Sequence, residues 1–503
     1  MTISRLLVTA LAAVGAAAAA DSPVVQALAR AEMKAALAPP LLAMQFRLSA
    51  GVALHERYPA QSRRLLDSAL AELPRLNWVM SGRVARALVE VSPKEAVAIA
   101  PYQPVLFSQE LFAWLVVTKH PAEALALFRE TAARLAEPLA PIDALWLARR
   151  APPEAAAESC ERVIRAASSP DYGKDGKTPV TATFQFGQTT FVTDNTRDTL
   201  LLVAGTRLRT VAPDRFEKLK DAFARWKIAD PAAVMNIRER AIPPDPPEIA
   251  AIHERRQTMR DLPTDADRAR LTTDLVREIR ALPPGPYRIM LFVGLCDRAT
   301  EGGDLGKEAL GAVASAMDAA MKDYPDGAWG DYYIILAELV RHAHLPVPPG
   351  AALDAALALL ELHEQIQQEN GFTLTGLDGK TYTLAGLKGR VVLLNFWERD
   401  TLCLKEMLEM DKLYHRYQQK GLTVIAVNSY EDRAEVEQFL AKNSFSFPIA
   451  LDPGRKVNTA FSVREIPIPK SFIFDREGRL AAQTIHMRTE SRLLELLKMA
   501  GLE

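Results

Sequence analysis

Residues 395–407, NFWERDTLCLKEM, bring together side chains that could carry out thiol chemistry. Cys403 is the one cysteine in this stretch, and Glu406 follows three residues later. If the segment is helical, residues three apart share a face, so the carboxylate can lie near the thiol. Asp400 is a good N-cap residue for such a helix, and its negative charge would tend to raise the pKa of the Cys403 thiol. Glu406 could equally be a surface side chain that pairs with Lys405.

These residues lie where the sequence pattern predicts alternating strands and helices. Continuous apolar runs at 390–397 and 422–429 are typical of strands buried on both faces, and residues 400–421 have the pattern of a helix that Gly421 ends. The pattern further predicts a hairpin over 371–389 with its turn at Asp378-Gly379, a helix over 434–443, a strand over 447–452, a hairpin over 471–485 with its turn at Glu477-Gly478, and a helix over 490–502. This order predicts a sheet with helices on both faces.

Several ordered motifs make this region resemble the thioredoxin superfamily, and in particular its exported TlpA/ResA-type thiol-disulfide oxidoreductases, which grade into the AhpC/TSA redoxins. The motifs are F-T-L-x-x-L-D-G-K at 372–380, L-x-x-L-K-G-R-V-V-L-L-N-F-W at 384–397, K-E-M at 405–407, K-L-Y-x-x-Y-x-x-K-G-L-x-V-I-A-V-N at 412–428 and P-x-S-F-I-F-D-x-x-G-R at 469–479. The resemblance implies an α/β thioredoxin fold for residues 370–503, and nothing before residue 370 supports it.

The resemblance also implies a C-x-x-C site, of which one cysteine is missing here. When the helix is aligned without a gap, Cys403 matches the second cysteine and Asp400 the first; a gap placed elsewhere would make Cys403 a displaced first cysteine. In the family the first cysteine, a thiolate at the helix N-terminus, attacks the target disulfide, and the second resolves the mixed disulfide. Because an aspartate cannot attack sulfur, the ordinary dithiol reaction is unavailable within this domain.

Two other family positions are kept. Glu406 matches an acidic residue that the family associates with proton handling. Pro469 matches a proline, cis in the family, that exposes backbone to which a substrate strand can pair, and Pro467 competes for this role. A peroxidase reading is weaker, because the peroxiredoxin motif P-x-x-x-T-x-x-C has Asp400 at its threonine position and Thr401 one residue off.

The chain before residue 370 is predicted to be mostly helical. Apolar residues recur at helical spacing in 64–73, 110–117, 122–135, 270–282 and 353–368. The motif Pro-x-Glu-Ala begins at Pro93, Pro121 and Pro152, and a period of about 30 residues is typical of stacked helical hairpins. We therefore expect a solenoid-like helical array; chance recurrence of a common helix start is the alternative.

Two segments interrupt this helical region. Residues 180–195 alternate apolar and polar side chains around Gly187 and Gln188, which predicts an inserted β-hairpin near 178–194. The proline-rich stretch 243–250 predicts a boundary. The expected organisation is therefore a signal peptide (1–20), a helical domain (21–243), a second helical subdomain (244–369) and a thioredoxin-like domain (370–503).

The N-terminal residues predict export. Arg5, an apolar run and Ala18-Ala19-Ala20 before Asp21 fit a cleavable signal peptide, and the run is too short and alanine-rich for a good membrane span. An uncleaved N-terminal helix is the alternative. We expect a bacterial periplasmic or secreted protein without an integral membrane segment in the mature chain. The formal net charge of −1 gives no reason to expect a nucleic-acid partner.

The remaining candidate ligands are few. Cys160 and Cys296 lie in helical-looking segments and are expected to be buried small hydrophobes, although either could approach Cys403 after folding. His342 and His344 point apart on a helix, so neither a metal nor a cofactor is expected.

Two functions remain open. The first is a TlpA-like redox protein with a degenerate single-cysteine site that acts on a thiol or disulfide substrate. The second is a non-catalytic binding or scaffold protein that holds a protein partner. An exposed, acidic Cys403 would favour the first, and a buried, inert one the second.

Overall fold

The computed structural model describes residues 22–76, 78–169, 172, 184–186, 189–192, 196–219, 238–239, 246–259, 262–300, 305–324, 329–461, 468–485 and 488–503. The predicted signal peptide, residues 1–20, lies outside this described part. Contacts divide the chain into two compact units: one ends at Glu72 and resumes from Pro247 to Glu503, and the other is Leu73–Pro246. Domain boundaries near residues 243 and 369 stay predictions.

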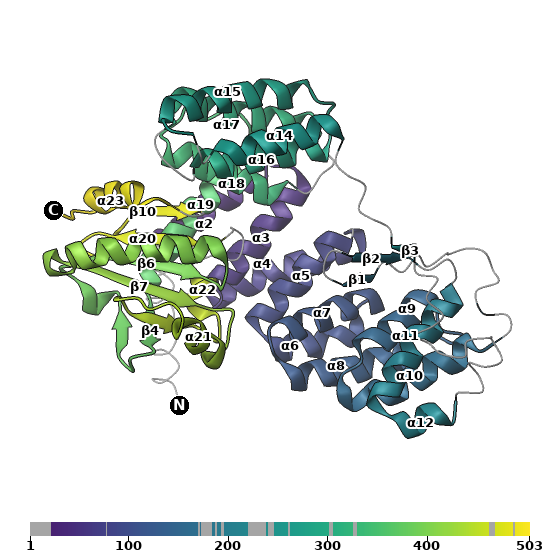
Figure 1. Ribbon diagram of the computed structural model, residues 1–503. Helices are drawn as coiled ribbons and strands as arrows, with labels where there is room; N and C mark the ends of the chain where they lie inside the picture. Colours follow the sequence, from purple (N-terminus) through teal and green to yellow (C-terminus); the bar gives the residue numbers. More distant parts are fainter. Residues whose placement is uncertain are drawn as a thin grey trace, which may run out of the picture. The chain divides into compact units, whose positions relative to one another are not determined.

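The unit Leu73–Pro246 is mostly helical (Figure 1). Its helices are η1 (Leu73–Arg75), α5 (Trp78–Val91), α6 (Pro93–Ile99), η2 (Ala100–Tyr102), α7 (Val105–Val117), α8 (Pro121–Arg134), α9 (Pro141–Arg150), α10 (Pro153–Ala167), α11 (Thr196–Val211) and α12 (Pro213–Glu217). Pro93 and Pro121 open α6 and α8, and Pro152 precedes α10. Proline suits the first helical turn because its missing N–H would have no intrahelical partner there. The Pro-x-Glu-Ala motifs therefore mark three helix starts.

The predicted inserted β-hairpin is confirmed. Strands β1 (Phe184–Phe186) and β2 (Thr189–Val192) pair antiparallel, with Phe184 opposite Phe191, and β3 (Arg238–Glu239) pairs with β2. The expected turn at Gly187 and Gln188 lies outside the described residues.

In the other unit, nine described helices share one apolar core. They are α2 (Pro23–Ala35), α3 (Pro40–Leu54), α4 (Pro59–Ala71), α14 (Pro247–Thr258), α15 (Asp265–Ala281), α16 (Pro286–Thr300), α17 (Gly306–Lys322), α18 (Gly330–His342) and α19 (Ala351–Asn370). Helix α2 packs along α19 with the helical-face residues Val24, Ala27, Leu28 and Ala31. The Arg30–Glu361 ion pair, 2.5 Å between Nη2 and Oε1, spans the same two helices. Segments far apart in the sequence therefore complete one core.

The C-terminal part of this unit is a seven-stranded mixed sheet in the order β10-β9-β6-β7-β8-β4-β5. The strands are β4 (Thr373–Gly376), β5 (Thr381–Thr383), β6 (Val391–Trp397), β7 (Leu422–Asn428), β8 (Ile449–Leu451), β9 (Lys470–Phe474) and β10 (Leu480–Ile485). The helices are η4 (Ala385–Leu387), α20 (Thr401–Tyr417), η5 (Gln418–Lys420), α21 (Arg433–Leu440), α22 (Lys456–Ala460) and α23 (Glu490–Met499). Strand β6 pairs parallel with β7 and antiparallel with β9.

The two faces of the central strand β6 belong to different cores, because successive side chains on a strand point to opposite sides. Val391, Leu393 and Trp397 join a cluster with α20 and α23. Val392, Leu394 and Phe396 join an aromatic cluster on the other face, which includes Phe461, Phe472 and Phe474. Helices α3 and α19 contact α22 on the side of Phe461, and the buried Gln367 Nε2 of α19 donates to the Phe461 carbonyl at 3.2 Å.

The predicted fold class, mostly helical and then α/β, is confirmed. Within the part of the chain that the structure describes, none of the helices combines the length and the apolar character needed to cross a bilayer. The five-residue helix α22 was missed, because a helix of little more than one turn leaves almost no periodic signal.

Candidate functional site

Cys403 lies in the first turn of α20, just after the strand β6 and the loop 398–400. Asp400 is the N-cap, as its residue type predicts, and its Oδ1 accepts a hydrogen bond from the Cys403 backbone N–H at 2.7 Å. The carboxylate therefore satisfies one of the N–H groups that would otherwise be available at the start of the helix.

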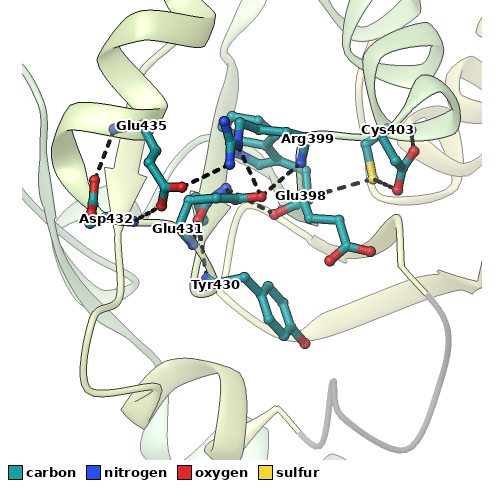
Figure 2. Close-up of polar contacts among 10 residues, drawn as sticks. Glu398, Arg399, Cys403, Tyr430, Glu431, Asp432 and Glu435 are labelled. Atoms are coloured by element: carbon teal, nitrogen blue, oxygen red, sulfur yellow. Dashed lines mark hydrogen bonds and ion pairs between the residues drawn. The ribbon is translucent and has the colours of Figure 1, made fainter. Parts of the chain in front are cut away.

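The Cys403 side chain is fully buried, with no exposed surface. Its Sγ donates a hydrogen bond to Asp400 Oδ2 at 3.2 Å and accepts one from the Glu398 backbone N–H at 3.5 Å, as Figure 2 shows. Burial raises the pKa of the thiol well above its usual value; the charges of Asp400 and Glu406 raise it further, and only the Glu398 N–H opposes them. The thiol is therefore held in its protonated form.

Glu406 is also fully buried, so the interpretation of a surface side chain paired with Lys405 is wrong. Its Oε1 accepts from the Arg488 backbone N–H at 2.7 Å, and its Oε2 accepts from Asn395 Nδ2 at 2.9 Å. Burial raises the pKa of this carboxyl to about 7, against the lowering effect of the Arg488 N–H, the Arg488 charge and the Asn395 amide. At neutral pH, the buried carboxyl therefore lies near its midpoint of protonation.

Asn395 connects this carboxyl to the neighbouring strand. Its Nδ2 also donates to Ser471 Oγ of β9 at 2.9 Å, and both residues are fully buried. Asn395 belongs to the N-F-W motif, for which the sequence predicts no role of this side chain. A polar residue inside a continuous apolar run was the signal that could have identified it.

The loop before the helix is fixed by an ion-pair cluster that the sequence analysis missed (Figure 2). The Arg399 guanidinium pairs with Glu435 at 3.0 Å and with Glu431 at 3.4 Å, and the Arg399 backbone N–H donates to Glu431 Oε1 at 3.2 Å. Glu431 in turn accepts from the amide of Asn428, the last residue of β7. Since these acids lie over thirty positions away along the chain, no local pattern identifies them.

Pro469 directly precedes β9, and its peptide bond with Ile468 is cis. Pro469 is buried, and Ile468 packs against the apolar cluster that contains Cys403. The competing Pro467 lies outside the described residues. The structure therefore brings Asp400, Cys403 and Glu406 together on one helix and connects the Pro469 segment to them through the core.

The other cysteines lie in other cores. Cys160 in α10 has no exposed surface, and burial raises its pKa to about 11. Cys296 in α16 is 2% exposed and belongs to the core of the helices, whereas Cys403 belongs to the core beneath α20. All three are free thiols. Among the described residues, no group of three or more His, Cys, Asp or Glu side chains is placed to hold a metal ion.

Comparison with known proteins places the C-terminal domain in a family. The model of the AhpC/TSA family matches residues 367–483. The thiol-disulfide oxidoreductase ResA of Bacillus thuringiensis (strain Al Hakam) is 38% identical over 128 residues, which are 25% of this chain and 73% of that protein. ResA of Bacillus subtilis (strain 168) is 32% identical over 129 residues, 25% of this chain and 71% of that protein.

Solved structures match a similar share of the chain. StoA from Bacillus subtilis is 26% identical, covers 25% of this chain and 94% of its own, and gives a TM-score of 0.23. The exposed lipoprotein thioredoxin Etrx1 from Streptococcus pneumoniae strain TIGR4 is 27% identical, covers 25% of this chain and 98% of its own, and gives a TM-score of 0.24. With the ResA relatives covered over more than two thirds of their length, the chain belongs, through its C-terminal domain, to the ResA-like thioredoxin-fold thiol-disulfide oxidoreductases of the AhpC/TSA family.

Proposed function

We propose that this chain is an exported protein whose thioredoxin-like domain no longer performs dithiol exchange and serves to bind a protein partner. One observation carries the proposal: the Cys403 thiol is buried and donates a hydrogen bond to the carboxylate that stands where an attacking cysteine would be. Disulfide exchange needs a thiolate that can reach the target sulfur. Here the Cys403 thiol is protonated and buried, and Asp400, at the position of the attacking cysteine, has no sulfur.

The ordered loop and proline around Cys403 support a binding role for this site. The loop 398–400 is held by Arg399, and the Pro469 segment enters the same core as the cysteine. The resemblance to the thioredoxin-like family implies that this cis proline exposes backbone to which an extended segment of a partner can pair. Export is supported by the signal-peptide pattern of residues 1–20 alone.

A thiol assay on the full mature chain tests the loss of exchange. We expect Cys403 to be alkylated by iodoacetamide in native buffer only as fast as the domain opens, and we expect the chain to reduce insulin disulfides no faster than buffer with the same dithiol. The matched control is Asp400→Cys, which restores C-x-x-C on the same scaffold and should gain reductase activity. Rapid labelling of native Cys403, or insulin reduction by the wild-type chain, would show that the monothiol is active.

Site-specific photo-crosslinking in the exporting cell tests the binding. A crosslinker at position 398, beside the cysteine, should yield one defined product with a protein of the same compartment. The same group at Lys380, whose side chain is 75% exposed near strand β5, is the control and should yield none. Equal products from both positions would mean that the loop 398–400 is not a binding surface.

A further inference from the structure

A buried ion pair joins the sheet to the helices on the face opposite Cys403. Lys470 Nζ of β9 lies 3.7 Å from Glu338 Oε1 of α18, and the two side chains are 2% and 1% exposed. Lys470 directly follows Pro469, and its backbone pairs with Phe396 of β6, the residue before Trp397. The pair therefore acts on the segment that enters the candidate site.

Besides Glu338, an aromatic ring of the sheet and a histidine of helix α19 lie near Lys470. Its ammonium group lies 5.0 Å from the ring centroid of Phe472, which belongs to the aromatic cluster of this face. His363 of α19 is 5% exposed and forms a hydrogen bond of 3.1 Å with Ser49 Oγ of α3. Burial, and then the charge of Lys470, lower the pKa of His363. Glu338 of α18 and His363 of α19 thus lie near this lysine of the sheet, and Ser49 of α3 binds His363.

A lysine at this position is not explained by the packing of the sheet itself. The next residues of β9 on the same face are Phe472 and Phe474, and an apolar side chain would fill the same place without a buried charge. Breaking a buried pair by removing one partner leaves an uncompensated charge, whereas replacing both partners by apolar residues is often neutral. We therefore expect the pair to add little net stability compared with two apolar residues, which favours a role in positioning.

We propose that Glu338 is a positioning residue: through Lys470, helix α18 sets where Ile468 and Pro469 lie. The packing of helices α3, α18 and α19 thereby controls the edge of the thioredoxin-like domain, at Ile468 and Pro469, to which the partner binds. As a form of regulation, this inference rests on the proposed function. The mechanical link between α18 and the Pro469 segment is separate from it.

Hydrogen exchange of the full mature chain tests the link. In Glu338→Gln, amides of residues 468–474 should exchange at least about tenfold faster. Without the Glu338 carboxylate, the Lys470 ammonium is more stable in water, so local opening of the start of β9 costs less free energy. Amides of β7, in the middle of the sheet, should keep their wild-type rates. The double variant Glu338→Leu/Lys470→Met should restore wild-type protection at 468–474.

The control is Lys34→Gln, which breaks the Lys34–Asp354 pair, 2.9 Å between Nζ and Oδ2, between helices α2 and α19 of the same core. This variant should leave residues 468–474 unchanged. Equal acceleration over all strands, or a double variant no better protected than Glu338→Gln, would overturn the link. If Glu338→Gln does not fold, Glu338→Asp, which keeps the charge but shortens the side chain and so weakens the pair with Lys470, should accelerate exchange at 468–474 by a smaller factor. Rapid labelling of Cys403 would refute the proposed function and leave these exchange rates as an independent result.

Discussion

Glu406 should make folding stability depend on pH in a direction unusual for a carboxyl group. Its pKa is about 7 in the folded chain, against 4.5 for an ordinary glutamate. Between these two values the folded state keeps a proton that the unfolded state has released, so stability falls as pH rises. Each unit of difference in pKa corresponds to about 1.4 kcal/mol, so ionisation of this fully buried group should destabilise the fold by about 3 kcal/mol at pH 8.

The informative change is Glu406→Gln, because glutamine resembles the protonated acid: its one carbonyl oxygen can accept from the Arg488 N–H or from Asn395, and its N–H₂ group replaces the acid O–H. The variant should match the wild type near pH 4.5 and exceed it by about 3 kcal/mol at pH 8. The assay is pulse proteolysis of the full chain in urea at pH 5, 6, 7 and 8, reading the fragments that contain β6. The control is Glu409→Gln, one turn further along α20, whose partly exposed pair with Lys412 should contribute less than about 1 kcal/mol at any pH.

Two results would refute this reasoning. A constant offset between the variant and the wild type from pH 5 to pH 8 would mean that the folded and unfolded pKa values of Glu406 are equal. A variant less stable than the wild type at pH 8 would mean that the ionised carboxylate is stabilised by the Asn395 and Arg488 contacts, and that these outweigh burial.

Further outcomes follow from other contacts. Asp400→Ala should destabilise the domain by about 1 kcal/mol in urea unfolding, whereas Asp400→Asn, which keeps a capping side chain, should be close to neutral. Either Glu338→Gln or Lys470→Met should destabilise by about 3–5 kcal/mol, and a double-mutant cycle should recover most of it in the apolar double variant. Burial, followed by the charge of Lys470, lowers the pKa of His363 to about 3. Because the unfolded chain takes up a proton below about pH 6.5 and the folded chain does not, the contribution of His363 to stability should fall as pH drops from 6.5 towards 4, opposite in sign to that of Glu406. In the Glu406→Gln background, His363→Gln should therefore remove a loss of thermal stability over this range. Intact-mass analysis of the exported chain should find its N-terminus at Asp21; an intact Met1 would exclude the predicted cleavage.

Many elements of the C-terminal fold could be predicted from the sequence, because hydrophobic periodicity and helix capping depend on residues close together in the chain. The apolar run of β6 lies within one residue of its predicted bounds, and α20 begins one residue after the predicted start, although it ends at Tyr417 and the 3₁₀ helix η5 follows it before Gly421. Asp400 caps that helix as its residue type predicts, since capping is an interaction over three residues. The cysteine, its cap and the helix could all be placed from one stretch of sequence.

The environment of the same residues could not be predicted. Whether Glu406 faces water or Asn395 depends on how α20 packs on β6, and helical spacing alone allows both. The Glu338–Lys470 pair joins residues more than a hundred positions apart, and both glutamate and lysine are residue types usually exposed to solvent. Buried polar contacts of this kind are settled by tertiary packing, which periodicity does not encode.

The packing of α2 along α19 has a consequence for synthesis and folding. The Arg30 and Glu361 side chains that meet there are 331 positions apart, so helix α2 cannot bury Val24 or Leu28 against α19 until almost three quarters of the chain exists. Between them lies the unit Leu73–Pro246, whose described helices contact neighbours close in sequence and can form early. We expect a chain truncated before α19 to protect that unit from protease and to leave α2 open to cleavage. Helix α2 would then be among the last parts to fold, and until α19 is made it would depend on a chaperone or on rapid completion of the chain to escape aggregation.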